Sequence, residues 1–236
     1  MIVFASLGFL ILSVLILCLL PLTPGIFAIF LHDATGQYSH KKVDDLSLFF
    51  ILGAETLKVL IFFLASVITW ALPLCTINFN NPALLWSLAG VFVAHSLAFC
   101  CFYFRKGDHA QLFVSRQTAH KFLKKTRLTK KRSDAFVLGL VSSIPELPFT
   151  LPLYFISVLS IMNISTLPLS CAGLIILFAF ITIIPLFIIY ASFKTGFNLA
   201  DFIKFRRKNK TFCRFFVSLL YLTIAVLFLS LGGISL

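Results

Sequence analysis

The chain has 236 residues, of which 60% are hydrophobic and 12% are charged, and its formal net charge is +12. Soluble globular domains carry roughly 25% charged residues, so this composition excludes an ordinary soluble protein and indicates a chain that lies in a lipid bilayer. The Lys and Arg residues concentrate in three segments of the sequence, which argues for a membrane topology and against a nucleic-acid partner.

Apolar stretches of transmembrane length follow one another along the chain. The hydrocarbon core of a bilayer is about 30 Å thick, and a helix needs about 20 apolar residues to cross it. The stretches that meet this length cover residues 2–31, 46–72, 84–104, 135–160, 169–193 and 214–234. We therefore expect an all-α membrane protein with six transmembrane helices in a single integral membrane domain, residues 1–236.

The first predicted span contains a proline pair, Pro21 and Pro24, in the sequence PLTPG. Proline removes a backbone donor and clashes with the preceding turn, so the pair predicts a broken helix at membrane depth. A broken helix leaves backbone carbonyls and amides free, which membrane proteins tolerate where these groups line a cavity.

The second predicted span carries a carboxylate, Glu55, nine residues after Leu46. This spacing places it ~14 Å along the helix, close to the middle of the hydrocarbon core. Lys58 follows three residues later on the same helical face and could neutralise it. Two interpretations of Glu55 stay open: a structural ion pair with Lys58, or a group that helps to bind a solute.

The basic residues fix the expected topology. They lie in or just after the first loop, between Arg105 and Arg132, and between Lys194 and Arg214, whereas the segments around 73–83 and 161–168 have none. Cytoplasmic loops carry the excess of Lys and Arg in membrane proteins. We expect the three basic loops in the cytoplasm and both termini on the extracytoplasmic side, in the inner (plasma) membrane of a bacterium.

The central basic linker, residues 105–134, divides the chain into two halves of three spans, 1–104 and 135–236. With an odd number of spans in each half, related halves would be inverted copies. The fourth span contains a second proline pair, Pro145 and Pro148, so the opening helix of each half is predicted to be broken by prolines. The two pairs lie at different depths along their helices, which weakens the symmetry.

Glu146 stands between the prolines of the fourth span, 12 residues after Asp134 and ~18 Å along the helix. A carboxylate at the bilayer centre costs at least ~2.5–3.5 kcal/mol to insert, so it should face protein or water rather than lipid. A carboxyl buried there would be protonated much of the time, which suits a proton relay or a group that gains charge when a cation arrives. The alternative is a neutral carboxyl that hydrogen-bonds backbone groups freed by Pro145 and Pro148.

Two basic segments, 109–132 and 197–210, mix apolar side chains with many cations. This pattern suits helices on anionic lipid headgroups, and the alternative is loops that only set the topology.

His95 is alone in the third span, and we expect a hydrogen-bonded interior residue rather than a ligand. The loop over residues 32–45 has His and Asp but matches no metal-site spacing, so no metal or cofactor is expected.

Three stretches of the second half carry a family pattern: DAFVLGLVSSIPELPFTLPL (134–153), FAFITIIPLFIIYASFKTG (178–196) and FVSLLYLTIAVLFLSLG (216–232). The first looks like a Gly-containing start of a fourth span followed by a proline-cysteine-x-proline element. The other two, with Pro185 in mid-span, are similar to the last two spans of the same unit. The chain thus resembles the transmembrane unit of the thiol-disulfide interchange and cytochrome c biogenesis proteins, which belongs with the lysine-exporter-like transporters.

The resemblance implies six spans in two inverted halves, both termini outside, and functional residues at the proline motifs of spans one and four. The redox chemistry of the family does not carry over, because Glu146 stands where the electron-relay members have a cysteine and PLTPG has no cysteine either. Related transporters move cations or small charged metabolites, and a carboxylate at this position suits that role.

The leading hypothesis is a transporter of a cation or small charged solute and not an enzyme. Glu146 would bind the solute or a proton, helped by the backbone around Pro21, Pro24, Pro145 and Pro148 and by Glu55. A homo-oligomer stays open. The competing hypothesis is a non-transporting assembly factor or partner-binding protein with a basic cytoplasmic surface. An intramembrane enzyme is less favoured, because the spans contain few polar residues.

Overall fold

The computed structural model describes residues 2–19, 40–71, 82–102, 129, 131–164, 168–194 and 199–234. Within these ranges the chain forms seven α-helices and one 3-10 turn, and no strand. The elements are α1 (Ile2–Leu19), α3 (His40–Ala71), α4 (Pro82–Phe102), α6 (Arg132–Ser143), η2 (Ile144–Glu146), α7 (Leu147–Ile164), α8 (Pro168–Lys194) and α9 (Leu199–Ile234). The all-α prediction is confirmed.

Four described helices are long and apolar enough to cross a membrane: Asp45–Ala71, Pro82–Cys101, Leu147–Ile164 and Phe215–Gly233. Val3–Leu19 and Ser170–Pro185 are shorter apolar helices. Helices of this length and composition are those of a helical integral membrane protein. Each of these helices overlaps one of the apolar stretches of the sequence, although α3 begins at His40, six residues before the predicted start of the second span.

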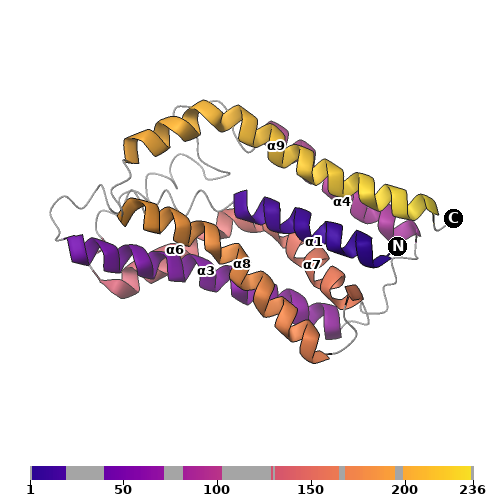
Figure 1. Cartoon of the computed structure of the whole chain (residues 1–236), viewed down its shortest axis with the longest axis horizontal. Coiled ribbons are helices and arrows are strands. Elements are labelled where there is room, and N and C mark those ends of the chain that lie inside the picture. The colour runs from indigo at the N-terminus through magenta and orange to yellow at the C-terminus, as the bar shows by residue number, and fades with distance from the viewer. Residues whose placement is uncertain are drawn as a thin grey trace.

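The helices lie side by side and alternate in direction, as Figure 1 shows. Both chain ends lie at the same end of the bundle. The most extensive contacts join α4 to α9, α3 to α6 and α1 to α7. In addition, α3 contacts α8, so each of the three helices of the first half touches the helix at the corresponding position of the second half.

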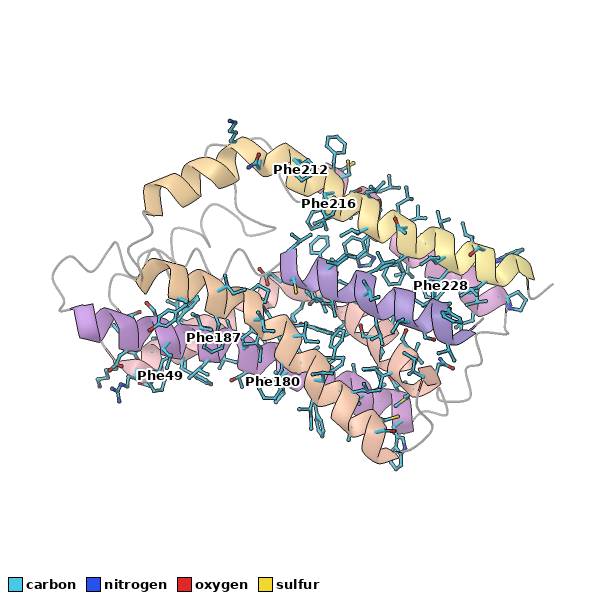
Figure 2. The ribbon with its side chains drawn as sticks, in the orientation of Figure 1. Phe49, Phe180, Phe187, Phe212, Phe216 and Phe228 are labelled. Carbon is cyan, nitrogen blue, oxygen red and sulfur yellow. The ribbon has the colours of Figure 1, made fainter. Side chains whose placement is uncertain are left out.

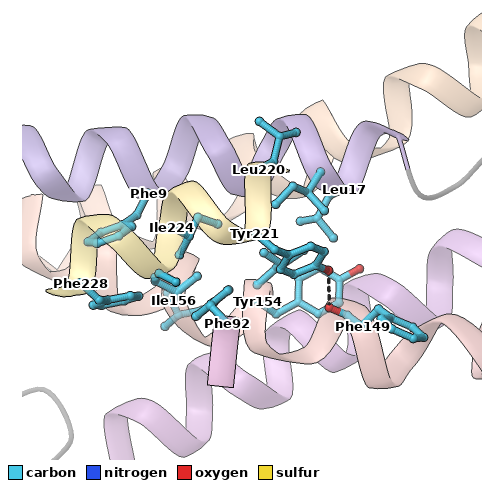
Figure 3. Close-up of a cluster of buried hydrophobic side chains, with 14 of the residues drawn as sticks. Phe9, Leu17, Phe92, Phe149, Tyr154, Ile156, Leu220, Tyr221, Ile224 and Phe228 are labelled. Carbon is cyan, nitrogen blue, oxygen red and sulfur yellow. Dashed lines mark hydrogen bonds between the residues drawn. The ribbon is translucent and has the colours of Figure 1, made fainter. Parts of the chain in front are cut away.

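Aromatic side chains fill the interior between α1, α4 and α9 (Figure 3). The Phe9 ring stacks on Phe228 at 4.4 Å between centroids, and Phe92 lies 5.8 Å from the same ring. The opposite surface of the helices is also apolar, and Figure 2 shows phenylalanines directed away from the bundle. Phe4 is 82% exposed and Trp70 is 75% exposed. An apolar exterior of this extent suits contact with lipid tails.

Helices α3 and α6 approach each other closely because each has a glycine at the contact. A methyl group on Gly53 would overlap the backbone carbonyl of Phe136, and one on Gly139 would overlap that of Phe50. Small residues allow such close packing between membrane helices. At the start of the same pair, Arg132 forms an ion pair with Asp45.

The fourth predicted span was expected to be broken at its proline pair, but the chain stays helical there, because the 3-10 turn η2 joins α6 directly to α7. Proline at position 145 deprives the Val141 carbonyl of its helical donor, and the Ile144 amide donates to that carbonyl instead. Proline at position 148 deprives the Ile144 carbonyl in the same way, and the Leu147 amide donates to it. The 3-10 geometry therefore satisfies both carbonyls that the pair would have left free.

Helix α9 contains the basic segment 197–210 from Leu199 onward as an extension of the last span rather than as a separate helix. No Gly or Pro interrupts the sequence before Gly232, which explains the continuity. Figure 1 shows α9 bending between its first part and the part that packs on α4. Most of the other basic segment, 109–132, and the proline pair Pro21 and Pro24 lie outside the described residues.

Candidate functional site

Glu146 is the last residue of η2, near the middle of the continuous helical segment formed by α6, η2 and α7, and only 1% of it is exposed. The prediction that this carboxylate faces protein rather than lipid is confirmed. Tyr154, two turns further along α7, is also buried and lies within electrostatic range of both Glu146 and Glu55. The two intramembrane carboxylates therefore belong to one region of the bundle.

Glu55 and Lys58 form the ion pair expected from their spacing on α3. Lys58 Nζ donates to Glu55 Oε1 at 2.9 Å, and both side chains are buried. The second carboxylate oxygen, Glu55 Oε2, has no hydrogen-bond partner within the described part of the chain. Taking two charges out of water costs free energy, so a buried ion pair is weak evidence that the pair stabilises the fold.

The end of α1 borders the same region, because the Cys18 thiol lies within electrostatic range of Lys58 and Glu55. We call Glu55, Lys58, Glu146 and Tyr154 the charge cluster. It lies where α1, α3 and α7 meet, and these three helices contact one another through α7. Two carboxylates and one ammonium leave one negative charge in excess when all three are ionised.

Buried hydroxyl groups also lie on α1 and α7, the helices that border the charge cluster. Helix α7 contributes Thr150, Ser157 and Ser160, all 2% exposed or less, and α1 contributes Ser6 and Ser13, which are fully buried. The hydroxyls of Ser6, Ser13 and Ser160 have no hydrogen-bond partner among the residues described.

A histidine from the first half binds the backbone of the fourth span. His95 Nδ1 lies 2.8 Å from the Val91 carbonyl oxygen of its own helix, and Nε2 lies 3.0 Å from the Pro148 carbonyl oxygen. Proline at position 152 removes the amide that would bond the Pro148 carbonyl in a regular helix, so His95 takes the place of that donor. The expectation that His95 is a hydrogen-bonded residue is confirmed.

Carbonyl oxygens lie within hydrogen-bond distance of both ring nitrogens of His95, and the tautomer decides which nitrogen donates. The ring packs against Tyr221 at 6.0 Å and against Phe149 at 6.3 Å between centroids. Tyr221 donates from its hydroxyl to the Phe149 carbonyl at 2.9 Å, as the dashed line in Figure 3 marks. Side chains from α4 and α9 thus hold two consecutive carbonyls of α7.

No family model, curated protein or solved structure matches the chain.

The structure therefore has to be interpreted from its own chemistry. Of the predicted site residues, Glu146 and Glu55 are brought into one cluster, and Pro145 and Pro148 flank Glu146 in the chain. In the described helices, no group of three or more His, Cys, Asp or Glu side chains could hold a metal ion.

Two important positions were missed from the sequence. Tyr154 was not singled out, because a tyrosine in an apolar run is usually a packing residue. Pro152 was also overlooked, although LPFTLP places a third proline four residues after Pro148. That spacing was the available signal, because a proline always deprives the carbonyl four residues earlier of its helical donor.

Proposed function

We propose that the chain is a transporter that moves a cation or small charged solute across the membrane, with Glu146 binding the solute or the coupling proton. The observation that carries the proposal is the charge cluster, in which three ionisable side chains are buried at the meeting point of α1, α3 and α7. Ionisable residues inside a membrane are costly, face the bundle interior, and mark ion pathways and proton relays. A negative charge on Glu146 would favour a positively charged solute.

The proposed scaffold has six spans in two inverted halves, with both termini extracytoplasmic and the protein in a bacterial inner membrane. The contacts of α1 with α7, α3 with α8 and α4 with α9 support this arrangement, because an inverted repeat brings equivalent helices together about its axis. Both chain ends at one end of the bundle fit an even number of crossings. The resemblance to the lysine-exporter-like group, which places the functional residues at the proline motif of span four, adds to it.

The test is flux in proteoliposomes that contain the purified chain. A panel of Na⁺, K⁺, L-lysine and octylammonium serves as solutes, and trapped pyranine reports proton movement. Glu146→Gln keeps the size of the side chain but cannot ionise, and we expect it to abolish flux of the solute that the wild type transports. Asp134→Asn is the matched control, because Asp134 is an exposed carboxylate at the start of α6. Flux in Glu146→Gln equal to the wild type, or no flux of any solute in the wild type, would contradict the proposal.

The second candidate is a membrane protein that binds an anionic partner through its basic surface. The basic part of α9, Leu199–Lys210, is helical beyond the last predicted span, which suits binding to anionic headgroups. Charge reversal of Arg206, Arg207 and Lys208 should then abolish binding to vesicles that contain phosphatidylglycerol, whereas Glu146→Gln should leave it unchanged. The same reversal should leave solute flux intact if the transporter proposal is correct.

A further inference from the structure

An apolar groove of about 580 Å³ lies between α3 and α8. Helix α3 contributes Ile51, Leu52 and Glu55, and α8 contributes residues between Phe180 and Ala191. Phe180 and Phe187 lie along α8 in the region where it crosses α3 (Figure 2). A groove of this size is within the range of small-molecule sites, which are usually apolar with a few polar groups.

The groove opens to the surface that lipid tails would cover. On the α8 side, Phe180 is 64% exposed and Ile188 is 60% exposed, and on the α3 side Leu52 is 41% exposed. A molecule bound there would enter from the bilayer rather than from water. Its body must therefore be apolar.

Among the described residues that line the groove, Glu55 is the only charged one, and only 4% of it is exposed. Lys58 occupies Oε1, while Oε2 accepts no hydrogen bond from any described residue. A buried carboxylate oxygen of this kind lacks a donor, and a charged donor would satisfy it better than a neutral one. An ionised Glu146 adds a negative charge to the same cluster, so a donor that carries a positive charge matches Glu55 Oε2 better than a neutral one.

We infer that the groove binds a lipophilic primary ammonium ion, whose N–H groups donate to Glu55 Oε2 while its apolar chain lies between α3 and α8. The inference rests on the proposed transport function and deepens it by naming the substrate class. No covalent step is involved: the cation binds and donates to the carboxylate. A proton at the cluster would compete with the ammonium for the same negative charge, which gives a physical basis for exchange of one for the other.

The test is equilibrium binding of radiolabelled octylammonium to the chain in lipid nanodiscs, with binding to empty nanodiscs subtracted. We expect saturable binding of one octylammonium per chain. Octyltrimethylammonium keeps the charge but has no N–H donor, and octanol has a donor but no charge. Each should displace radiolabelled octylammonium only at concentrations about tenfold higher or more, because each lacks part of the charge-assisted hydrogen bond.

Two variants locate the site. Glu55→Gln with Lys58→Met removes both charges of the ion pair together, so that neither is left buried alone. Ile184→Trp fills the groove from a half-exposed position of α8, and Ile176→Trp is its control, because Ile176 is similarly exposed on α8 but does not line the groove. We expect about tenfold or greater loss of octylammonium binding in the first two and none in the control.

Three results would overturn the inference. Octanol that competes as well as octylammonium would mean that the groove holds a neutral lipid chain. Binding unchanged in both the double variant and Ile184→Trp would place the cation elsewhere. If the wild type binds no octylammonium and Ile184→Trp converts a dimer to a monomer in native mass spectrometry, the groove is an interface with a second copy.

The outcomes also separate this inference from the transport proposal. Octylammonium binding as described, with no flux of any solute in the wild type, would leave the groove site standing and remove the transport function. Flux of L-lysine or a metal cation that depends on Glu146, without any octylammonium binding, would remove the groove site alone.

Discussion

Hydrogen bonding between His95 and the fourth span can be tested by a double-mutant cycle. The perturbation is His95→Phe, which keeps an aromatic ring of similar size against Tyr221 and Phe149 but removes both ring nitrogens. The Pro148 carbonyl then loses the donor that lies 3.0 Å away. Because Pro152 supplies no amide, the regular helical donor four residues on is absent.

The expected cost follows from the chemistry of the carbonyl. An apolar environment without water leaves the carbonyl unsatisfied, at a cost of about 1–3 kcal/mol in the free energy of unfolding. In the Pro152→Ala background the amide of residue 152 can bond the Pro148 carbonyl, so the same His95→Phe change should cost about 1 kcal/mol less. Pro152→Ala alone should stabilise the helix, because a proline inside a helix costs about 3 kcal/mol.

The assay is steric trapping in bicelles, which gives the free energy of unfolding of the wild type, both single variants and the double variant without denaturant. Ser87→Ala is a control, because Ser87 donates only within its own helix, to the Ala83 carbonyl. Additive effects of His95→Phe and Pro152→Ala would refute the reasoning, because the cycle measures the interaction that the two residues share through the Pro148 carbonyl.

Two further predictions concern the stability of the bundle, measured in the same assay. Gly53→Ala and Gly139→Ala should each destabilise by about 1–3 kcal/mol, because the added methyl overlaps backbone, whereas Gly90→Ala should be neutral or stabilising, since nothing lies within 4 Å of its added methyl. Lys58→Met alone should cost about 3–5 kcal/mol by leaving Glu55 unpaired, and Glu55→Gln with Lys58→Met should cost much less; equal costs would contradict the buried pair.

Much of the secondary structure was predictable because the apolar stretches are long and the loops polar. The bounds of α4 differ from the predicted third span by two residues at each end. The Glu55–Lys58 pair was predictable for a local reason, since residues three apart on a helix are neighbours. In both cases the information lies within a single helix.

The arrangement of the helices was not predictable in the same way. Gly53 and Gly139 are ordinary in their sequence contexts, and only the contact of α3 with α6 reveals that each lies against the other helix's backbone. The bond from His95 to Pro148 joins residues 53 positions apart and depends on a helix pairing that no local pattern specifies. The groove likewise exists only because α8 crosses α3.

The 3-10 turn η2 has a consequence for which neighbours one span can have. A 3-10 helix advances about 120° per residue and an α-helix about 100°, so three residues of η2 shift the angular phase of everything after them by roughly 60°. Along this continuous helical segment, α6 packs on α3, whereas α7 packs mainly on α1 and also contacts α3. Glu146 is the last residue of this turn, directly before α7. The proline pair thus rotates α7 relative to α6 within one helical segment, and Glu146 lies where that rotation occurs.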